Sequence, residues 1–237
     1  MPQKTTPAKI AFDKKAAALY VGIAKRKAKK TIEFTGLTML DFDKNQELIG
    51  IELVGVPKPK RGKTALLFST PYIQLKQRGK WAYASRTKST GVVGIIALTD
   101  DNKVILVEQL RIPHNKLVIE LPAGLVGDEI QGEDELAAAR KELLEETGYS
   151  AKRITRFGTP TCSSAGLSDE TIQLFIATGL TKTGEGGGVG SENITVHKVP
   201  LKRYFPWLMK QQALGKITDS KTLAVPAILN FAKKSKP

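Results

Sequence analysis

The chain has 237 residues and a formal net charge of +14, with 41% hydrophobic and 25% charged residues. These values are ordinary for a soluble globular protein with one sizeable domain and an appendage, or with two small domains. The single cysteine, Cys162, excludes an intramolecular disulfide, and no apolar run reaches the roughly 18 residues that a membrane-spanning helix needs.

The positive charge is concentrated at the front of the chain. Residues 1–90 contain 19 Lys and Arg but 6 Asp and Glu, a net charge of +13, whereas residues 91–237 carry +1. Such a segment can contact nucleic acid or an anionic membrane, but a solvated arm or helix face is the commoner interpretation. We therefore expect no membrane partner, and nucleic acid is not favoured as a partner of residues 1–90. The N-terminus lacks the segment order of a signal peptide, so we expect a cytoplasmic protein.

Residues 1–63 are interpreted as a basic N-terminal extension. Residues 8–30 are expected to form a Lys-rich helix or arm, and residues 31–56 to form short strands. The segment PKPKRGK, residues 57–63, is typical of a turn or linker.

Strand signals become dense after residue 63. The runs GVVGIIALT and KVILVEQLR are joined by Asp100-Asp101-Asn102, which predicts a hairpin. A helix of about fourteen residues is expected in the acidic segment that follows. Two further helices are expected near the C-terminus, one on each side of residues 215–219. Because strands and helices do not alternate regularly, the pattern favours a mixed α+β chain over a doubly wound parallel sheet.

The acidic segment, residues 127–149, holds eight Asp and Glu residues. Glu142, Glu145 and Glu146 share one face of the expected helix, because residues three and four apart are neighbours on a helix surface. Glu145 and Glu146 lie near the C-terminal end, where the helix dipole disfavours anions. Nearby cations do not offset three carboxylates, and hard divalent cations such as Mg²⁺ prefer oxygen ligands. The spacing therefore favours a cation site over a solvated acidic face.

This segment resembles the Nudix box, G-x5-E-x7-R-E-U-x-E-E-x-G-U, in which U is a bulky apolar residue. Eight of its nine fixed positions match, at Gly127, Glu133, Glu142, Leu143, Glu145, Glu146, Gly148 and Tyr149. Lys141 stands where the family has Arg, so the positive charge is kept but the planar, two-pronged donor is lost. We expect weaker bracing of the box glutamates, with activity retained.

The flanking segments resemble the ADP-ribose pyrophosphatase branch of that family. VEQLR and IELPAG, within residues 107–124, are similar to its E-Q-Y-R and E-L-P-A-G signature, and SSAGLSDE, residues 163–170, is similar to its S-P-G-x-S-x-E loop. The resemblance covers about residues 64–226 and implies a Nudix fold, a mixed β-sheet between helices, in residues 64–237. In that branch the box glycine is the glycine of P-A-G, here Gly124. Either Gly127 takes over its role, or the loop bulges by three residues.

The resemblance implies hydrolysis of the pyrophosphate bond of ADP-ribose or a related nucleoside diphosphate sugar, giving a nucleoside monophosphate and a sugar phosphate. Mg²⁺ is the implied cofactor, with Mn²⁺ as an alternative. The implied metal ligands are the backbone carbonyl of Ala123 and the carboxylates of Glu142, Glu145 and Glu146. The implied supporting residues of the box are Gly127, Glu133, Lys141 and Gly148.

Two further groups of residues follow from the same resemblance. Glu192 is the expected general base, because similar enzymes place a mobile catalytic glutamate after such a Gly-rich segment, and Glu170 is the alternative. The expected substrate-binding residues are Trp81, Arg86, Arg111 and Glu120. Branch members are usually homodimers with exchanged N-terminal strands, so a homodimer is expected here.

Other functions stay open at this point. The box handles the pyrophosphate and does not distinguish ADP-ribose from GDP-mannose or a dinucleotide. A Nudix domain that binds ADP-ribose or nucleic acid without cleaving it is a further alternative. Such domains commonly lose box glutamates, which are all present here, so hydrolysis is favoured.

Overall fold

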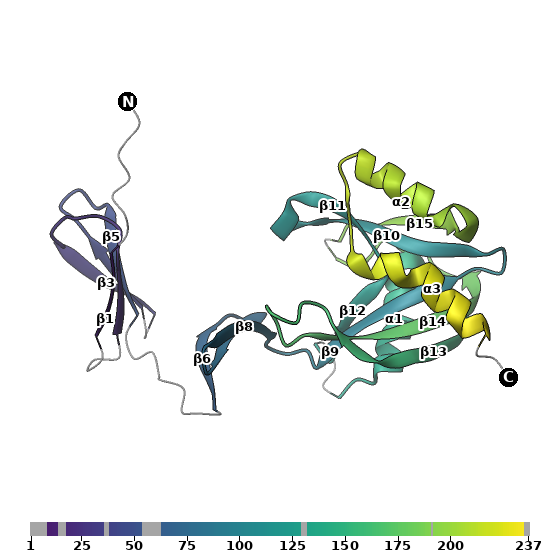
Figure 1. Cartoon of the computed structure of the whole chain (residues 1–237), viewed down its shortest axis with the longest axis horizontal. Helices are drawn as coiled ribbons and strands as arrows, with labels where there is room; N and C mark the ends of the chain where they lie inside the picture. Colours follow the sequence, from purple (N-terminus) through teal and green to yellow (C-terminus); the bar gives the residue numbers. More distant parts are fainter. Residues whose placement is uncertain are drawn as a thin grey trace. The chain divides into compact units, whose positions relative to one another are not determined.

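The two apolar runs between residues 91 and 111 form adjacent central strands in a computed structural model of the chain (Figure 1). The structure describes residues 9–13, 18–35, 38–53, 63–128, 132–190 and 192–234. Contacts divide the chain into two compact units, Met1–Ala84 and Ser85–Pro237. This division falls within the strand of residues 81–86, whereas the sequence suggested a boundary after residue 63.

The second unit is built on a mixed sheet of eight strands. The strand order is β13-β14-β9-β10-β11-β16, while β12 pairs with β9 and β15 pairs with β10. The strands are β9 (Gly91–Leu98), β10 (Lys103–Arg111), β11 (Lys116–Glu120), β12 (Ala123–Val126), β13 (Tyr149–Cys162), β14 (Thr171–Lys182), β15 (Thr195–Pro200) and β16 (Ile217–Thr218). Strand β14 is parallel to β9 and β16 is parallel to β11, and the other described pairs of this sheet are antiparallel. The predicted mixed sheet and the β9–β10 hairpin are therefore confirmed.

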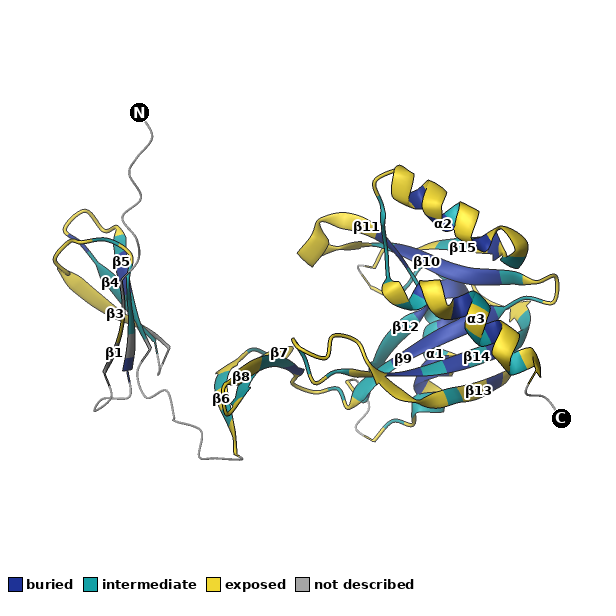
Figure 2. Ribbon diagram, viewed as in Figure 1, coloured by how far each residue is buried: buried dark blue, intermediate teal, exposed yellow. Residues whose placement is uncertain are grey.

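Helices cover both faces of this sheet. The helical elements are η1 (Ile112–His114), α1 (Glu135–Thr147), η2 (Leu201–Arg203), α2 (Tyr204–Ala213) and α3 (Ser220–Lys234). Successive residues of a strand point to opposite faces, so Ile95 and Ala97 pack in the core beneath α1 while Ile96 packs in the core beneath α2 and α3. Figure 2 shows both cores as dark blue strands between the helices. The expected fold class, with helices on both sides of a mixed sheet, is confirmed.

A buried carboxylate ties the C-terminal segment to the sheet. Glu108 on β10 accepts hydrogen bonds from Lys216, at 2.5 Å, and from His197 on β15, at 2.9 Å. Burial alone raises the pKa of Glu108, but these two donors outweigh burial and hold the pKa below its usual value. The carboxylate is therefore charged in the folded protein and fixes the approach of residue 216 to the sheet.

The first unit contains two antiparallel sheets, each described here by itself. The larger has the strand order β1-β2-β5-β4-β3, and the smaller has the order β6-β7-β8. The strands are β1 (Lys9–Asp13), β2 (Ala18–Gly22), β3 (Lys30–Thr35), β4 (Thr38–Phe42), β5 (Leu48–Leu53), β6 (Thr64–Ser69), β7 (Ile73–Arg78) and β8 (Trp81–Arg86). The short strands expected in residues 31–56 are confirmed.

The helix suggested for residues 8–30 is wrong. Strands β1 and β2 occupy this segment and pair antiparallel, with Lys9 opposite Gly22. Leu19, Val21 and Ile23 alternate with other residues at the period of a strand, and this local alternation prevails over a loosely helical spacing. Most of the expected linker, residues 57–62, lies outside the described residues. Among the described helices, none is long and apolar enough to cross a membrane.

Candidate functional site

Helix α1 forms the frame of the site because both of its ends are capped. The Asp134 side chain accepts hydrogen bonds from the backbone N–H groups of Leu136 and Ala137, at 3.0 and 3.3 Å. At the other end Gly148 adopts a left-handed conformation, with φ of 70°, and donates its N–H to the carbonyl of Leu144. The predicted helix is confirmed with these bounds, and its acidic face is fixed relative to β12.

Two glutamates of α1 lie directly against strand β12. The backbone N–H of Ala123 donates a hydrogen bond of 3.0 Å to Glu146, whose residue is 4% exposed. Gly124 faces Glu142 so closely that a β-carbon at this position would overlap the carboxyl group of Glu142. A glycine is therefore needed at 124 for the close approach of helix and strand.

The two candidate glycines have different roles. Gly124 leaves space for Glu142, whereas Gly127 has a φ of 78° and donates its N–H to Glu133 at 3.1 Å. Glu133 thus links the loop at Gly127 to the segment just before α1. The two glycines therefore make different contacts, Gly124 with the helix and Gly127 with Glu133.

The carboxylates of α1 lie close enough to perturb one another. Burial chiefly, together with the negative charges of Glu145, Glu192 and Asp128, raises the pKa of Glu142 to about 7 against the opposing charge of Lys141. Burial also raises the pKa of Glu146 to about 8, and the hydrogen bond from Ala123 opposes this shift. A cation beside these two carboxyl groups would favour their charged forms.

These residues line a cavity of about 520 Å³ in the second unit. Its acidic residues are Glu120, Asp128, Glu142, Glu145, Glu146, Glu170, Glu192 and Asp219, and its basic residues are Arg86, Arg111, Lys141 and Lys221. Residues from β10, β12, α1, and the loops before β14 and β15 contribute to it. The cavity thus combines a carboxylate wall with several cations, which suits a ligand that is itself anionic and brings or shares a metal cation.

Each of the two arginines in the cavity is held by a glutamate. Arg111 Nε donates to Glu120 at 2.8 Å, and Arg86 Nε donates to Glu170 at 2.8 Å. The second oxygen of Glu170 accepts a hydrogen bond of 3.1 Å from Ser163. Both oxygens of Glu170 are therefore engaged, and its loop is fixed to the end of β8.

The Gly-rich loop is attached to the C-terminal end of α1. The N–H groups of Gly187 and Gly188 donate to the carbonyls of Glu146 and Glu145, at 2.9 and 3.0 Å. Lys182 Nζ donates to the carbonyl oxygens of Thr147, at 2.9 Å, and of Glu185, at 2.7 Å. These bonds satisfy carbonyl groups that the end of a helix leaves without partners, and the lysine charge complements the helix dipole.

Glu192 follows this loop and reaches the cavity with an exposed side chain. Its carboxylate accepts one hydrogen bond, of 2.9 Å, from the N–H of Val189, and its charge raises the pKa values of both Glu142 and Glu146. Gly188 lies against the Glu192 side chain, where a β-carbon would collide with it. The loop therefore holds Glu192 beside the carboxylates of α1.

The structure brings together most of the site residues that the sequence predicted. Those lining the cavity are Arg86, Arg111, Glu120, Ala123, Lys141, Glu142, Glu145, Glu146, Glu170 and Glu192. Trp81 belongs to the first unit, where its side chain is 70% exposed on β8. Sequence reasoning missed Lys182, Ser163, Asp128 and Lys221. Lys182 lacks a motif, and its partner Thr147 lies 35 residues away in the sequence.

Comparison with known protein families matches residues 88–215 to the NUDIX domain. Residues 9–56 match a second family, described as a protein of unknown function, DUF2283. The first match covers the strands from β9 to β15 together with α1 and α2, and the second covers the five-stranded sheet of the first unit.

Individual relatives agree with the first match. The chain is 30% identical over 184 residues to the methanol dehydrogenase activator of Bacillus methanolicus, covering 73% of this chain and 94% of that protein. It is 38% identical over 103 residues to the ADP-ribose pyrophosphatase of Bacillus subtilis, covering 44% of this chain and 54% of that one. A crystal structure of an ADP compounds hydrolase has the same fold, with a TM-score of 0.58 at 16% identity, covering 76% of this chain and 96% of its own.

Proposed function

The chain belongs to the Nudix hydrolase family, and from that premise we propose that it hydrolyses the pyrophosphate bond of ADP-ribose or of a closely related nucleoside diphosphate sugar. The products are a nucleoside monophosphate and a sugar phosphate. The observation that carries this proposal is the cavity in which the carboxylates of α1 face Arg111 and Arg86. A diphosphate needs both a cation at its oxygens and donors at its flanks, and this cavity supplies residues for each.

The residues fit a divalent cation such as Mg²⁺, with Mn²⁺ as an alternative. Among the described residues, no three His, Cys, Asp or Glu side chains converge into a ready-made ion site. Mg²⁺ does not require such a cage, because it typically keeps several waters and binds one or two carboxylates together with substrate phosphates. Glu142 and Glu146, with Glu145 and the Ala123 carbonyl beside them, would hold it. The raised pKa values of Glu142 and Glu146 support this fit, because a cation would stabilise both carboxylates.

When bound, the cation neutralises phosphate charge and makes a coordinated water more acidic. The protein's own residues do the positioning. Arg111, oriented by Glu120, donates to the diphosphate oxygens, and Lys141 adds positive charge at the same wall. Arg86, the last residue of β8, approaches the substrate and is held in place by Glu170 of the loop of residues 163–170. Trp81, the remaining expected substrate-binding residue, belongs to the first unit, where it is 70% exposed.

Glu192 is the proposed general base. In the reaction, the oxygen of a water forms a bond to one phosphorus, the bond from that phosphorus to the bridging oxygen breaks, and the proton of the water passes to Glu192. Glu192 has one described hydrogen bond and an exposed carboxylate, whereas both oxygens of Glu170 are occupied. This difference favours Glu192 as the base and gives Glu170 the role of holding Arg86.

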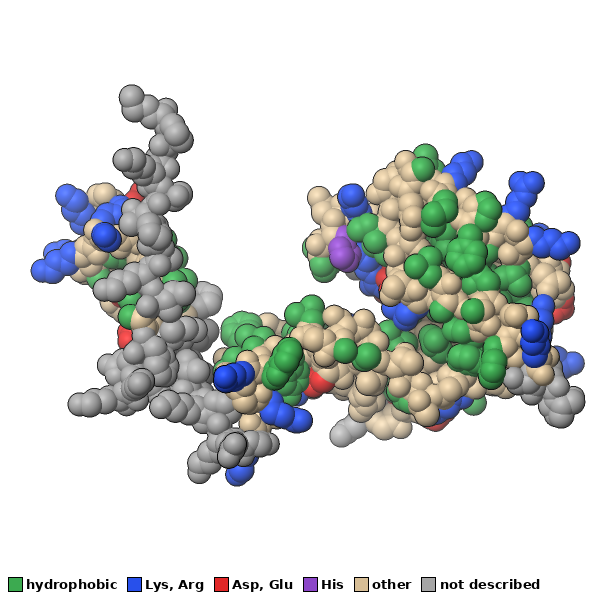
Figure 3. All heavy atoms as spheres, in the orientation of Figure 1, with side chains coloured by type: hydrophobic (Ala, Val, Ile, Leu, Met, Phe, Trp, Pro, Cys, Tyr) green, Lys and Arg blue, Asp and Glu red, His purple; other side chains and the backbone are tan. Residues whose placement is uncertain are grey.

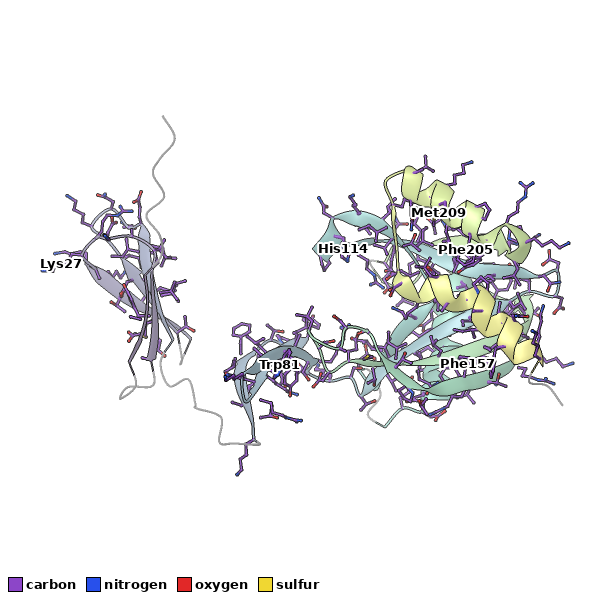
Figure 4. All side chains as sticks on the ribbon, in the orientation of Figure 1. Lys27, Trp81, His114, Phe157, Phe205 and Met209 are labelled. Carbon is purple, nitrogen blue, oxygen red and sulfur yellow. The ribbon has the colours of Figure 1, made fainter. Side chains whose placement is uncertain are left out.

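We also propose that two copies of the chain associate through the β6-β7-β8 sheet. Large apolar side chains are exposed on its strands, namely Leu66, Phe68, Ile73, Leu75 and Trp81. Figure 4 labels Trp81 on this sheet. An exposed apolar face of this kind marks an interaction surface, and a second copy of the same face is its proposed occupant.

The test is turnover on a panel of substrates with Mg²⁺ or Mn²⁺: ADP-ribose, GDP-mannose, UDP-glucose, NADH and FAD, with products separated by chromatography. Preferred cleavage of ADP-ribose to AMP and ribose 5-phosphate is the expected result. Preferred cleavage of GDP-mannose or of a dinucleotide would support hydrolysis of a pyrophosphate bond but would assign a different substrate to the protein. If no member of the panel is cleaved although the protein binds Mn²⁺, hydrolysis of this substrate class is ruled out.

A further inference from the structure

The five-stranded sheet of the first unit carries a dense group of cations on the loop between β2 and β3. Residues 25–30 read Lys-Arg-Lys-Ala-Lys-Lys, and all six are exposed. The sheet lies within residues 9–56, whose matched family has no assigned function. Figure 4 shows Lys27 extending outward from this sheet, and Figure 3 shows Lys and Arg side chains gathered around it in blue.

The loop has a fixed shape, unlike the solvated arm that the sequence suggested. Arg26 pairs with Asp43, at 2.6 Å, and with Glu47 on the neighbouring β4–β5 turn. Asp43 is 5% exposed and also accepts the N–H groups of Asn45, at 2.8 Å, and of Glu47, at 3.0 Å. The N–H of Lys29 donates to the carbonyl of Phe42, the last residue of β4, at 2.8 Å. The loop is therefore bound to β4 as well as to the β4–β5 turn.

These contacts form a hollow of about 440 Å³, which we call the basic hollow. Its wall contains Arg26, Lys27, Lys29 and Lys44, together with Asp43, Asn45 and Ala28. The charge of Asp43 is already neutralised by Arg26. In the part of the chain that the structure describes, no carboxylate is paired with Lys27, Lys29 or Lys44, so three lysines whose charge is not balanced by an ion pair line one hollow.

We propose that the basic hollow binds a nucleic acid through its phosphate backbone. The unbalanced cations belong to two separate turns, and Lys25 and Lys30 extend the positive charge beyond the hollow along the chain. A single small anion would neutralise only part of this row, whereas successive phosphates of one strand can engage several of these lysines at once.

The shape of the hollow favours a nucleic acid over an anionic membrane. A membrane surface is broad, and proteins that bind it usually combine lysines with apolar side chains that enter the acyl region. Ala28 is the one apolar residue among the described residues of the wall. A sugar–phosphate strand can enter a concave space lined by lysines, and a plane of lipid headgroups cannot follow it.

The experiment uses the full-length protein and a fluorescein-labelled single-stranded RNA of about 20 nucleotides, long enough for one folded unit to bind. Binding is measured by fluorescence anisotropy at several salt concentrations. Replacing Lys25, Lys27, Lys29 and Lys44 by Gln is expected to weaken binding by at least tenfold. It should also make the slope of log K against log salt shallower by about 2 to 3, since each phosphate contact contributes about 0.7.

A matched control removes four exposed lysines from the second unit, Lys152, Lys202, Lys210 and Lys234, also by substitution with Gln. This control removes the same number of positive charges as the hollow variant. It is expected to change RNA affinity by less than about twofold, because the position of the lysines, and not the total charge, determines binding. Replacing the four hollow lysines by Arg should retain binding. Both Gln variants should keep their melting temperature and their turnover of the nucleoside diphosphate sugar.

Two results would overturn the proposal. One is an equal loss of RNA affinity in the control variant and the hollow variant, which would show that total charge alone explains the loss. The other is the absence of RNA binding at low salt while phosphatidylglycerol vesicles bind and phosphatidylcholine vesicles do not, which would assign the surface to a membrane. Neither result depends on the hydrolytic activity, so the proposed function is tested separately.

Discussion

At the scale of single residues, the carboxylate of Glu146 is the group on which the proposed reaction depends most. It is 4% exposed, accepts the Ala123 N–H, and has a pKa raised to about 8 by burial. In metal-free protein near neutral pH this carboxyl is largely protonated. A protonated glutamate resembles glutamine in shape and in polarity. Replacing Glu146 by Gln should therefore change the activity of the protein without changing its stability.

We predict that Glu146→Gln reduces kcat at least about a hundredfold, as expected when a charged group that serves the transition state is lost. Its melting temperature without metal should stay close to that of the wild type, because Gln replaces a neutral carboxyl. Added Mg²⁺ or Mn²⁺ should raise the melting temperature of the wild type more than that of the variant. Turnover at the wild-type rate would contradict the assignment of Glu146 as a metal ligand.

Single substitutions also distinguish the roles of the two loop glutamates, Glu192 and Glu170. Glu192→Gln should lower kcat by about 10² to 10⁴ with little change in KM, because a general base has been lost. Glu170→Gln should chiefly raise KM, because it releases Arg86 and Ser163 from their hydrogen bonds. Steady-state kinetics between pH 5 and 9 distinguish them, and the reverse pattern would make Glu170 the base.

How far these roles can be predicted from the sequence depends on the separation of the residues along the chain. Glu142, Glu145 and Glu146 share a helix face through local geometry, so their grouping follows from spacing alone. The pairing of Arg86 with Glu170 spans 84 residues and requires the fold to be known. The distinct roles of Gly124 and Gly127 are also invisible in the sequence, because they depend on the distance between α1 and β12.

At the scale of elements, the attachment of the Gly-rich loop to α1 positions the proposed base. Five glycines in residues 184–190 suggest a mobile loop from the sequence. In the structure, backbone donors of this loop instead satisfy the last carbonyls of α1, and Lys182 adds two more bonds. Glycine is used here because the backbone must approach the helix end closely, with Gly186 at a φ of 75° beside Thr147.

We predict that Lys182→Met lowers kcat about tenfold with little change in KM, because Glu192 loses its fixed position while the substrate contacts stay intact. Lys182→Arg should recover part of the loss, since Arg can also donate to both carbonyls. Lys152→Met, on the neighbouring strand, is the control and should behave as the wild type. A higher KM with unchanged kcat would show that Lys182 serves substrate binding instead.

The strands of residues 9–22 show why element prediction fails at the front of the chain. Lysines and alanines are good helix formers, and their abundance in residues 8–30 suggests a helix. Yet β2 pairs with both β1 and β5, and these hydrogen-bonded partners decide the outcome. Long-range pairing of this kind overrides local propensity. Helix α1 is the opposite case, because its caps and its apolar positions agree locally.

At the scale of the whole molecule, the apolar face of the β6-β7-β8 sheet determines the expected assembly. We predict that the wild type is a dimer at micromolar concentration by light scattering coupled to size exclusion. Phe68→Glu should shift it toward a monomer, because the 52% exposed Phe68 then brings a charge into the interface. Leu214→Glu, at a residue that is 64% exposed in the second unit, is the control and should stay dimeric. A monomeric wild type would overturn the dimer.

The chain's single thiol has a practical consequence. Cys162 is exposed at the end of β13 and is followed directly by Ser163, whose hydroxyl holds Glu170 at the cavity. An environment-sensitive dye coupled to this thiol would therefore be carried by the segment that positions Arg86. Its emission can report ligand arrival in real time, without any cysteine having to be removed or introduced first.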